Sequence, residues 1–455
     1  MRDADEFCSD IQSLAHLRAF LHQAAGSQST LVTRAPGRLD VMGGVADYSG
    51  ALVAEATIAE AALIALRWRT DNVWRFWSLA PGSEMPGLHA QLSLDVFFGR
   101  HGLRDYAEVQ AELTGDSQSR WAAYLAGCVF VLMAEGHAPA LRAGANVLLR
   151  STVPLGAGVS SSAAIEVAMM QALNVALGLN LDGVTLARLA QQAENKVVGA
   201  PCGIMDQMAS ALGVQNSLLA ILCQPHEVQG TQHWPDDVRL FGINSNVAHS
   251  VGGGAYARAR VAAFMARRLI GVDYLANAMW PLMGGHLGPP LPETINGADF
   301  LRTYGETGDS VTRIDPSVTY PVRAAAEHGI KENRRARMFL KMLARPDIDI
   351  TLPAAGAYMG QSHESYTRLG LGSAETDLLV TLARRAGYSR GIYGAKITGG
   401  GSGGTVAFLT RGANAEQTLQ NIAAQYQQQT GLVPQIVEAG QSPGAISFGF
   451  RKVED

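Results

Sequence analysis

The chain has 455 residues, of which 47% are apolar and 17% are charged, so disorder is excluded as its main state. Thirty-six Lys and Arg residues against 40 Asp and Glu residues leave a net charge of −4. This balance argues against a nucleic-acid binder that depends on a basic patch. The length predicts two or three domains, each with room for a substantial core.

Four cysteines, at positions 8, 128, 202 and 223, are scattered and form no C-x-x-C pair, so we expect neither a disulfide scaffold nor a structural zinc site. The first ten residues lack the apolar core of a signal peptide. The longest mainly apolar stretch, Trp121 to Ala134, is shorter than the ~20 residues of a membrane helix. We therefore expect a cytoplasmic protein that contacts no membrane; the oligomeric state stays open.

Helical and strand patterns alternate along the chain. The expected helices span 10–25, 120–136, 161–178, 182–198, 203–213, 254–269, 329–345 and 372–387, and the expected strands lie within 30–80 and at 145–153, 238–245 and 405–409. The segment 280–325 is rich in Gly and Pro and is predicted to be irregular. This order indicates the α+β class, with a boundary near residue 240 between domains 1–240 and 241–455.

The segment from Arg150 to Leu173 has the pattern of a phosphate-binding loop. A strand runs into a turn at positions 156–158 (Gly-Ala-Gly), and three serines at 160–162 then open an Ala-rich helix. Unpaired N–H groups at a helix N-terminus attract anions, and glycines let the backbone approach them closely. The G-K-[ST] ending of a Walker A loop is absent. The alternative is that the serines only cap an ordinary helix.

A second glycine-rich turn lies between Lys396 and Leu409, with glycines at 399–401, 403 and 404. Five glycines in six positions are costly in chain entropy unless a close approach requires them. The alternative is a loose loop, although the apolar strand directly after the turn argues against it.

Two carboxylates flank a Gly-Ala-Pro connection between helices. Glu194 lies on the helix that ends at Gly199, and Asp206 lies on the first turn of the next helix. Such a connection can bring both carboxylates to one cleft, and a helix N-terminus favours an ionised acid. The alternative is that Asp206 only supports its own helix, but its apolar flanks favour a buried or cleft-lining position.

These segments, together with a fourth, resemble the motifs of the GHMP small-molecule kinases, and most of all their galactokinase branch. The branch has an A-P-G-R opening, a P-L-G-x-G-x-S-S-S-A loop, a P-C-G-I-M-D-Q run and a T-G-G-G-x-G-G turn. They stand here in order at Ala35–Arg38, Pro154–Ala163, Pro201–Gln207 and Thr398–Gly404. The segment Ile243–Tyr256 is similar to the N-S-N-V-x-H-S region of the same family.

The resemblance implies a two-domain fold with the active site in the cleft between the domains. It implies that ATP and Mg²⁺ are bound and that the γ-phosphoryl group passes to the anomeric hydroxyl of a small-molecule sugar. Carried over by position, Asp206 is the catalytic carboxylate, Arg38 stabilises the transferring phosphoryl group, and Ser162 and Glu194 hold Mg²⁺. The sugar contacts are Asp47, Gly203, Tyr256 and the departing positions Gly44 and Val45. The ATP contacts are Trp121, Pro154, Leu155, Gly156, Ala157, Gly158, Val159, Ser160, Ser161, Ser162, Gly400 and Gly401.

The opening motif departs from the galactokinase pattern at two positions. Galactokinases usually read G-E-H-T-D-Y, whereas this chain has Gly44 and Val45 in place of the Glu and His. In the family, those polar residues are associated with the C6 end of the hexose. L-arabinose has the ring configuration of galactose and no C6, so the apolar pair suits it. The stretch Asp309–Ala324 and the motif V-M-G-G-x-A-D-Y-S-G are also similar to L-arabinokinases.

Two other functions compete with this interpretation. The first is a galactokinase or a uronate kinase with a rebuilt pocket; a uronate needs a cation at the C6 end, which Gly44 and Val45 do not supply. The second is a non-catalytic sugar sensor on the same fold. A sensor tolerates loss of the phosphate loop or of Asp206, and here all these features are present.

Overall fold

The computed structural model describes residues 1–26, 29–80, 82–247, 254–278 and 291–454 and contains two principal β-sheets. The first has the strand order β16-β1-β2-β7-β3-β4, with β8 paired to β2 and β9 to β8. Only the β3–β7 pair is parallel among these pairings. Its strands are β1 (Thr30–Met42), β2 (Leu52–Trp68), β3 (Val73–Leu79), β4 (Pro86–Ser93), β7 (Ala145–Ser151), β8 (Ser217–Leu222), β9 (Glu227–His233) and β16 (Arg451–Val453).

Strand β2 organises this sheet. It contains no Gly or Pro, and most of its small and branched side chains are buried. One half of β2 pairs with β7 and the other half with β8, while β1 runs beside both halves. The β1–β2 register shifts twice, between Pro36 and Arg38 and between Asp40 and Met42. Such bulges re-aim side chains next to functional sites.

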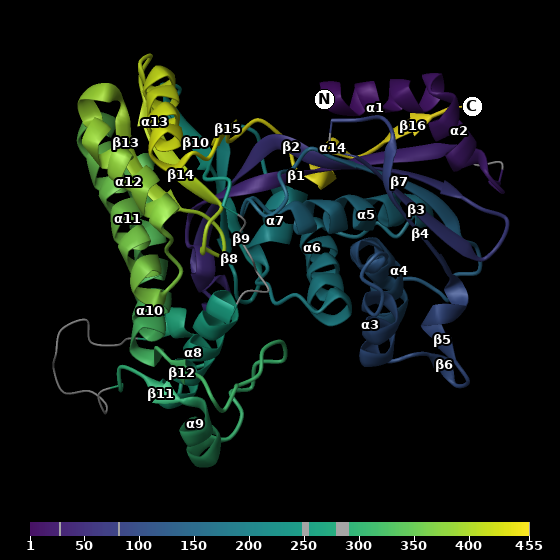
Figure 1. The fold of residues 1–455 in the computed structure, drawn as a ribbon, viewed down its shortest axis with the longest axis horizontal. Coiled ribbons are helices and arrows are strands. Elements are labelled where there is room, and N and C mark those ends of the chain that lie inside the picture. The colour runs from purple at the N-terminus through teal and green to yellow at the C-terminus, as the bar shows by residue number, and fades with distance from the viewer. Residues whose placement is uncertain (27–28, 81, 248–253, 279–290, 455) are drawn as a thin grey trace.

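Helices cover both faces of the first sheet (Figure 1). Helices α3 to α7 pack below it in this view, with α5 buried along most of its length. Helices α1 and α2 cover the other face through a cluster that includes Phe7, Leu63 and Leu148. The helices are α1 (Arg2–Ser13), α2 (Ala15–His22), α3 (Tyr106–Thr114), α4 (Ala123–Ala134), α5 (Ser161–Leu177), α6 (Gly183–Gln192) and α7 (Met205–Leu212), and the short strands β5 (Phe98–Gly99) and β6 (Gly102–Leu103) form a hairpin nearby.

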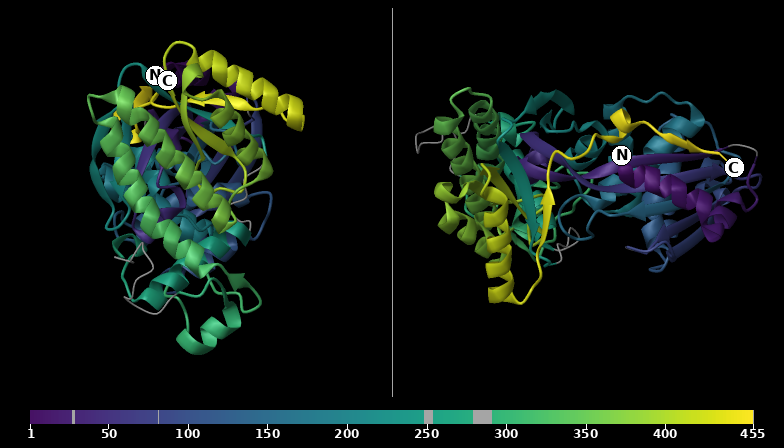
Figure 2. Two further views of the ribbon diagram at one scale, coloured as in Figure 1. Left: turned by 90° about the vertical axis from the view of Figure 1, so that its left-hand side faces the viewer. Right: turned by 90° about the horizontal axis from the view of Figure 1, so that it is seen from above.

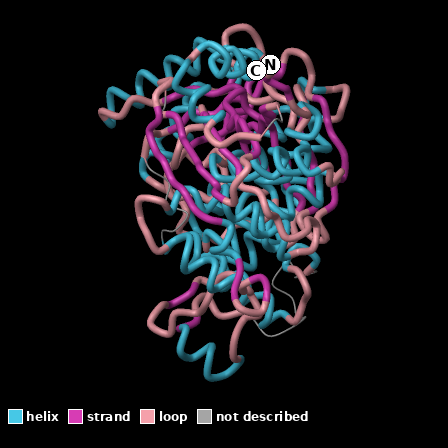
Figure 3. Tube along the Cα trace, turned by 90° about the vertical axis from the view of Figure 1, so that its right-hand side faces the viewer, coloured by secondary structure: helices cyan, strands magenta, loops and turns pink. Residues whose placement is uncertain are grey.

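The second sheet has the antiparallel order β13-β14-β10-β15, and α12 and α13 pack on it through Leu379, Leu382 and Leu419. Its elements are β10 (Val238–Asn244), α10 (Val322–Leu343), α11 (Ile348–Leu369), α12 (Ala374–Ala386), β13 (Ile392–Ile397), β14 (Thr405–Arg411), α13 (Ala415–Thr430) and β15 (Gln435–Glu438). A smaller lobe of helices, loops and a two-stranded sheet lies below (Figure 3). It holds α8 (Gly254–Ile270), β11 (Ile295–Asn296), α9 (Gly297–Tyr304) and β12 (Thr319–Tyr320).

The last segment of the chain returns to the first sheet, as the view from above shows (Figure 2). Helix α14 (Ala445–Phe448) packs against the first part of the molecule, and β16 pairs with β1. The predicted boundary at residue 240 falls inside β10. The division into domains 1–240 and 241–455 therefore stays a prediction, with the end of the chain crossing it.

The elements differ from the expectations in several places. The helix expected at 10–25 is two helices separated at Leu14, which has an extended backbone. Within the described part of 280–325, the segment contains α9 and the two-stranded sheet of β11 and β12, with irregular backbone between them; its densest Gly and Pro run, 284–290, lies outside the described residues. Helix α11 was not predicted, because Pro353 and Gly356 interrupt its pattern. Gly356 lies so close to β13 that an added Cβ would be 1.8 Å from the Tyr393 carbonyl.

Candidate active site

A cavity of about 110 Å³ collects residues from all four motifs. The motif residues come from β1, the loop before α5 with the first residues of that helix, the segment that leads into α7 with its first turn, and the turn after β13. The structure therefore brings together segments that are far apart in the chain. The predicted site residues lining this cavity are Arg38, Gly44, Val45, Asp47, Gly156, Gly158, Ser160, Ser161, Ser162, Glu194, Gly203, Asp206, Tyr256 and Gly400.

Arg38 and Asp206 form the centre of this cavity. Two guanidinium nitrogens of Arg38, Nε and Nη2, donate to Asp206 Oδ1 at 3.0 and 2.8 Å, and Nη1 donates to the Gly158 carbonyl at 2.7 Å. Arg38 is almost fully buried, whereas the Asp206 side chain keeps 22% of its surface exposed. One arginine thus joins the acid of the third motif to the backbone of the phosphate loop, and the acid stays open to a substrate.

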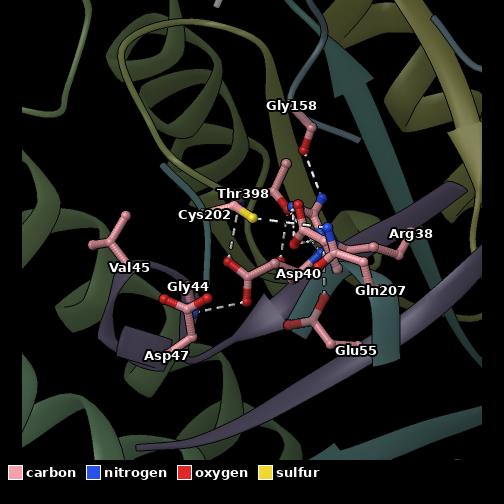
Figure 4. A network of polar contacts seen from close by, with 12 residues as sticks. Arg38, Asp40, Gly44, Val45, Asp47, Glu55, Gly158, Cys202, Gln207 and Thr398 are labelled. Atoms are coloured by element: carbon pink, nitrogen blue, oxygen red, sulfur yellow. Dashed lines mark hydrogen bonds and ion pairs between the residues drawn. The ribbon is translucent and has the colours of Figure 1, made fainter. Parts of the chain in front are cut away.

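Glu55 belongs to none of the sequence motifs and lies on β2, next to the Arg38 guanidinium (Figure 4). Its Oε2 is 3.4 Å from Arg38 Nε, and within the described part of the chain neither carboxyl oxygen accepts a hydrogen bond. Burial, reinforced by the charge of Asp40, raises the pKa of Glu55 well above its ordinary value. An acid in an apolar strand carries no local signal; the register that pairs Asp40 with Glu55 places it here.

The loop before α5 has the geometry of an anion site. Gly156, Gly158 and Ser160 have positive φ values of 66°, 73° and 62°. Among the described residues no side chain caps this helix, and the buried Ser160 hydroxyl has no hydrogen-bond partner. The alternative in which the serines are only helix caps is therefore wrong. Free N–H groups and an unpaired hydroxyl at a helix N-terminus fit a phosphate group.

The turn after β13 is packed against this loop. The Thr405 hydroxyl donates to the Ala157 carbonyl at 2.8 Å, and a Cβ on Gly404 would lie 2.7 Å from the same oxygen. A Cβ on Gly399 would lie 2.8 Å from the Gly158 carbonyl. The loose-loop alternative is therefore wrong, because close packing explains these glycines.

Glu194 lies on a π-helical turn, Ala193–Val198, that continues α6. Such turns are frequent at functional sites. Its carboxyl accepts from Gln207 at 2.7 Å; burial raises its pKa, and a hydrogen bond from Ser162 opposes that rise. Within the described residues, no cluster of three or more His, Cys, Asp and Glu could hold a metal. Two oxygen donors still fit Mg²⁺, which takes its other ligands from phosphates and water.

The segment Gly43–Tyr48 holds three of the predicted sugar contacts and is named the sugar-binding segment for that prediction. It is buried along one side of the cavity. The Asp47 carboxylate packs on Gly203, where a Cβ would lie 1.5 Å from its Oδ2. Burial, with the charge of Asp206 adding to it, raises the pKa of Asp47 to about 7. The ring of Tyr256 meets that of Tyr48 edge to face, with centroids 6.0 Å apart.

Two cations near this segment are already engaged. Arg38, the one cation among the described residues that line the cavity, is held by Asp206 and Gly158. Arg260 on α8 donates to both oxygens of Asp309, at 2.8 and 3.0 Å, and to the Cys202 carbonyl. Neither guanidinium is free to pair with a uronate carboxylate.

Six predicted ATP residues do not line this cavity, and their roles stay predictions. Leu155 is 75% exposed, while Ala157 and Val159 are buried. Trp121 is partly buried, with an indole nitrogen that has no partner among the described residues. The six are Trp121, Pro154, Leu155, Ala157, Val159 and Gly401. The segment Ile243–Tyr256 is described only in part, since 248–253 lies outside the described residues.

Comparison with known proteins gives the family. The patterns of the GHMP kinase N-terminal and C-terminal domains match residues 123–214 and 345–428. The galactokinases of Pasteurella multocida and Roseiflexus sp. are 31% and 30% identical, over 89% and 94% of this chain and 91% and 95% of theirs. The chain belongs to the galactokinase branch of the GHMP kinases. The predicted family is thereby confirmed.

This GHMP kinase is also similar to the L-arabinokinase of Arabidopsis thaliana, at 37% identity over 94% of the chain. The chain spans about half (47%) of the length of that plant protein. Among solved structures, Lactococcus lactis galactokinase in complex with galactose aligns over 97% of this chain and 99% of its own, with a TM-score of 0.73 at 20% identity. A mevalonate kinase aligns over 90% and 99%, with a TM-score of 0.53 at 14% identity.

These alignments confirm the predicted α+β GHMP fold. In the described part of the chain, none of the helices has the length and apolar character needed to cross a bilayer.

Proposed function

We propose that this chain is a sugar 1-kinase that transfers the γ-phosphoryl group of ATP to the anomeric hydroxyl of L-arabinose, giving L-arabinose 1-phosphate. One observation carries the proposal. The Arg38–Asp206 pair lies between an uncapped helix N-terminus and a sugar-binding segment without a polar side chain at Gly44 and Val45. The similarity to L-arabinokinase and to galactokinases supports the same choice.

The chain's own residues supply positioning and charge. Asp206 holds the anomeric hydroxyl through its open carboxylate and accepts its proton during transfer. Arg38, fixed by Gly158, orients that carboxylate and places a planar cation beside the transferring group. Ser162 and Glu194 would hold Mg²⁺, and the Gly156–Ser162 loop would bind the phosphates. When bound, Mg²⁺ and ATP supply charge neutralisation and the phosphoryl group.

The choice of L-arabinose depends on the end of the pocket formed by Gly44 and Val45. Gly44 has φ +33°, and an added Cβ would lie 1.5 Å from the Tyr366 hydroxyl, so no side chain fits there. Val45 is 1% exposed and offers only methyl groups. A C6 hydroxyl there would lose its partners, at a cost of about 1–3 kcal/mol. The engaged state of Arg38 and Arg260 likewise disfavours a uronate.

A panel of sugars tests this proposal. ATP consumption is measured with L-arabinose, D-galactose, D-galacturonate and D-glucuronate at matched concentrations, and the product is identified by ³¹P and ¹H nuclear magnetic resonance. We expect the highest kcat/KM with L-arabinose, by ~10-fold or more over D-galactose, and loss of the free anomeric centre in the product. Equal or better use of D-galactose contradicts the arabinose assignment, and absence of ATP consumption with every sugar contradicts the kinase assignment.

A further inference from the structure

Two segments of the candidate site are joined by buried side chains that do not line the cavity. One segment is the sugar-binding segment, Gly43–Tyr48; the other is the turn Thr398–Gly404. Asp40, fully buried on β1, reaches both segments. Its Oδ1 accepts from the Gly44 N–H at 3.0 Å (Figure 4). Its Oδ2 accepts from the Gly399 N–H at 3.2 Å. The Thr398 hydroxyl also exchanges hydrogen bonds with the Asp40 backbone.

Lys396 forms a buried ion pair with Asp40. Its Nζ lies 2.7 Å from Asp40 Oδ2, and both side chains have no exposed surface. The same ammonium group lies 5.3 Å from the centre of the Tyr366 ring. A buried ion pair is costly to form unless its geometry and remaining hydrogen bonds are good, and here the carboxylate oxygens also accept two backbone N–H groups.

Tyr366, on α11, also links the sugar-binding segment to Gly399, through a hydroxyl group instead of a carboxylate. Its hydroxyl accepts from the Val45 N–H at 2.9 Å and donates to the Gly399 carbonyl at 2.8 Å. The hydroxyl also fills the space that a side chain at position 44 would need. Asp40 and Tyr366 therefore each make one bond to the sugar-binding segment and one to Gly399.

Gly399 in turn lies close to Gly158 and Arg38. An added Cβ there would lie 2.8 Å from the Gly158 carbonyl and 3.0 Å from Arg38 Nη2. Gly158 is the residue whose carbonyl receives Arg38 Nη1. A continuous path of contacts thus runs from Val45, through the Tyr366 hydroxyl and Gly399, to Arg38.

We propose that Asp40, Lys396 and Tyr366 form a positioning cluster that fixes the distance between the bound sugar and the phosphoryl-transfer centre. The proposal rests on the proposed sugar kinase function. Errors of about 1 Å in the placement of reacting groups cost ~100-fold in rate. The hydrogen bonds of Asp40 and Tyr366 to Gly399 would limit such errors. The cluster acts through the backbone of residues 44, 45 and 399, and its members are positioning rather than catalytic residues.

The test is Tyr366→Phe, which removes both hydrogen bonds and keeps the ring. We expect the sugar KM to rise ~10-fold and kcat to fall several-fold. A change of this size corresponds to the loss of about one buried hydrogen bond in the sugar complex and one in the transition state. The KM for ATP should stay within about two-fold, because the Thr405–Ala157 contact is kept. Tyr426→Phe is the matched control, since Tyr426 is equally buried and its hydroxyl donates to the Ser245 carbonyl at 2.8 Å.

The control should lose similar thermal stability without a change in sugar KM. Identical kinetics of both variants, or wild-type kinetics of a folded Tyr366→Phe, overturn the proposal. All constants are measured with the sugar that the wild-type enzyme uses best. If the sugar kinase assignment fails, the wild-type protein is inactive with every sugar. If only the positioning proposal fails, the wild type is active and the Tyr366 variant behaves like it.

A second set of variants separates position from stability. Asp40→Asn alone leaves Lys396 buried without its counter-charge and should be strongly destabilised. The double change Asp40→Asn with Lys396→Met removes both charges, so the melting temperature should recover in part. An Asn side chain has a single oxygen, so it can accept from the Gly44 N–H or from the Gly399 N–H but not through two separate oxygens as Asp40 does. The raised sugar KM should therefore persist. A stable double variant with wild-type sugar KM and kcat overturns the proposal.

Discussion

Asp206 is the residue on which turnover should depend most directly. Asp206→Asn keeps the shape and removes the charge that accepts a proton, so we expect kcat to fall by ~10²–10⁴ with the fold intact. Steady-state kinetics and a thermal melt check this. Asp182→Asn is the control, because Asp182 caps α6 and asparagine is an equally good cap. A kcat for Asp206→Asn within a few-fold of wild type removes Asp206 from the catalytic role.

Asp47 should give the sugar KM a pH dependence whose sign follows from its raised pKa. In the free protein its pKa is about 7, because the ionised form is buried beside Asp206. Sugar hydroxyls donate to the ionised form, so binding should weaken as pH falls below 7, by up to ~10-fold per unit, and should level off above 7. Sugar KM measured from pH 5.5 to 8.5 tests this. Asp47→Asn should bind weakly at every pH; a wild-type sugar KM that does not vary over this range contradicts the assignment.

Glu55 should lower the stability of the protein as pH rises. Its pKa is raised in the folded state, so the folded protein binds this proton more tightly than the unfolded chain. The favourable contribution is complete below the ordinary pKa of a glutamate and is lost as pH rises towards the folded value. Glu55→Gln should therefore melt near the wild-type temperature at pH 4 and a few degrees above it at pH 8. A difference independent of pH excludes titration of Glu55 as the cause.

At the scale of elements, the phosphate loop and α5 act together. The helix N-terminus has no cap among the described residues, and Ser162 lies in its first turn with Glu194 within hydrogen-bond reach. Ser162→Ala should raise the Mg²⁺ concentration needed for half-maximal activity several-fold without unfolding the protein, because Mg²⁺ keeps its phosphate and water ligands. A Mg²⁺ titration at saturating ATP and sugar measures this. An unchanged midpoint removes Ser162 from the metal site.

Local elements of the site could be predicted from the sequence because each is a short loop with its own chemistry. The helices after Ser160 and Ile204, and the strand after the second glycine-rich turn, lie where the residue patterns place them. Glu55 and Tyr366 could not be found in this way. Glu55 reaches the site through strand register, and Tyr366 meets Val45 across 321 residues of chain on a helix whose pattern is interrupted. Both depend on tertiary packing, which carries no local signal.

At the scale of the molecule, the two sheets meet around β1, which supplies Arg38 and Asp40 to the site. The same strand pairs with β16, formed by the last residues of the chain. The domain boundary predicted near residue 240 could not reveal this pairing, because it joins residues 30–32 to residues 451–453. The β1–β16 pair and the contacts of α14 therefore tie the C-terminal segment to the sheet that carries Arg38.

Removal of that segment tests how far the molecule depends on it. A chain ending at Gly444 loses α14 and β16, and with them the buried side chains of Ala445, Phe448 and Val453. It also exposes an unpaired edge of β1, which favours aggregation. We expect the melting temperature to fall by ~5 °C or more, with soluble protein lost on heating. A chain lacking only the last two residues is the control, since they follow β16. A truncated chain that melts within about 2 °C of the full chain shows that the first sheet is stable without its last strand, and supports an independent first domain.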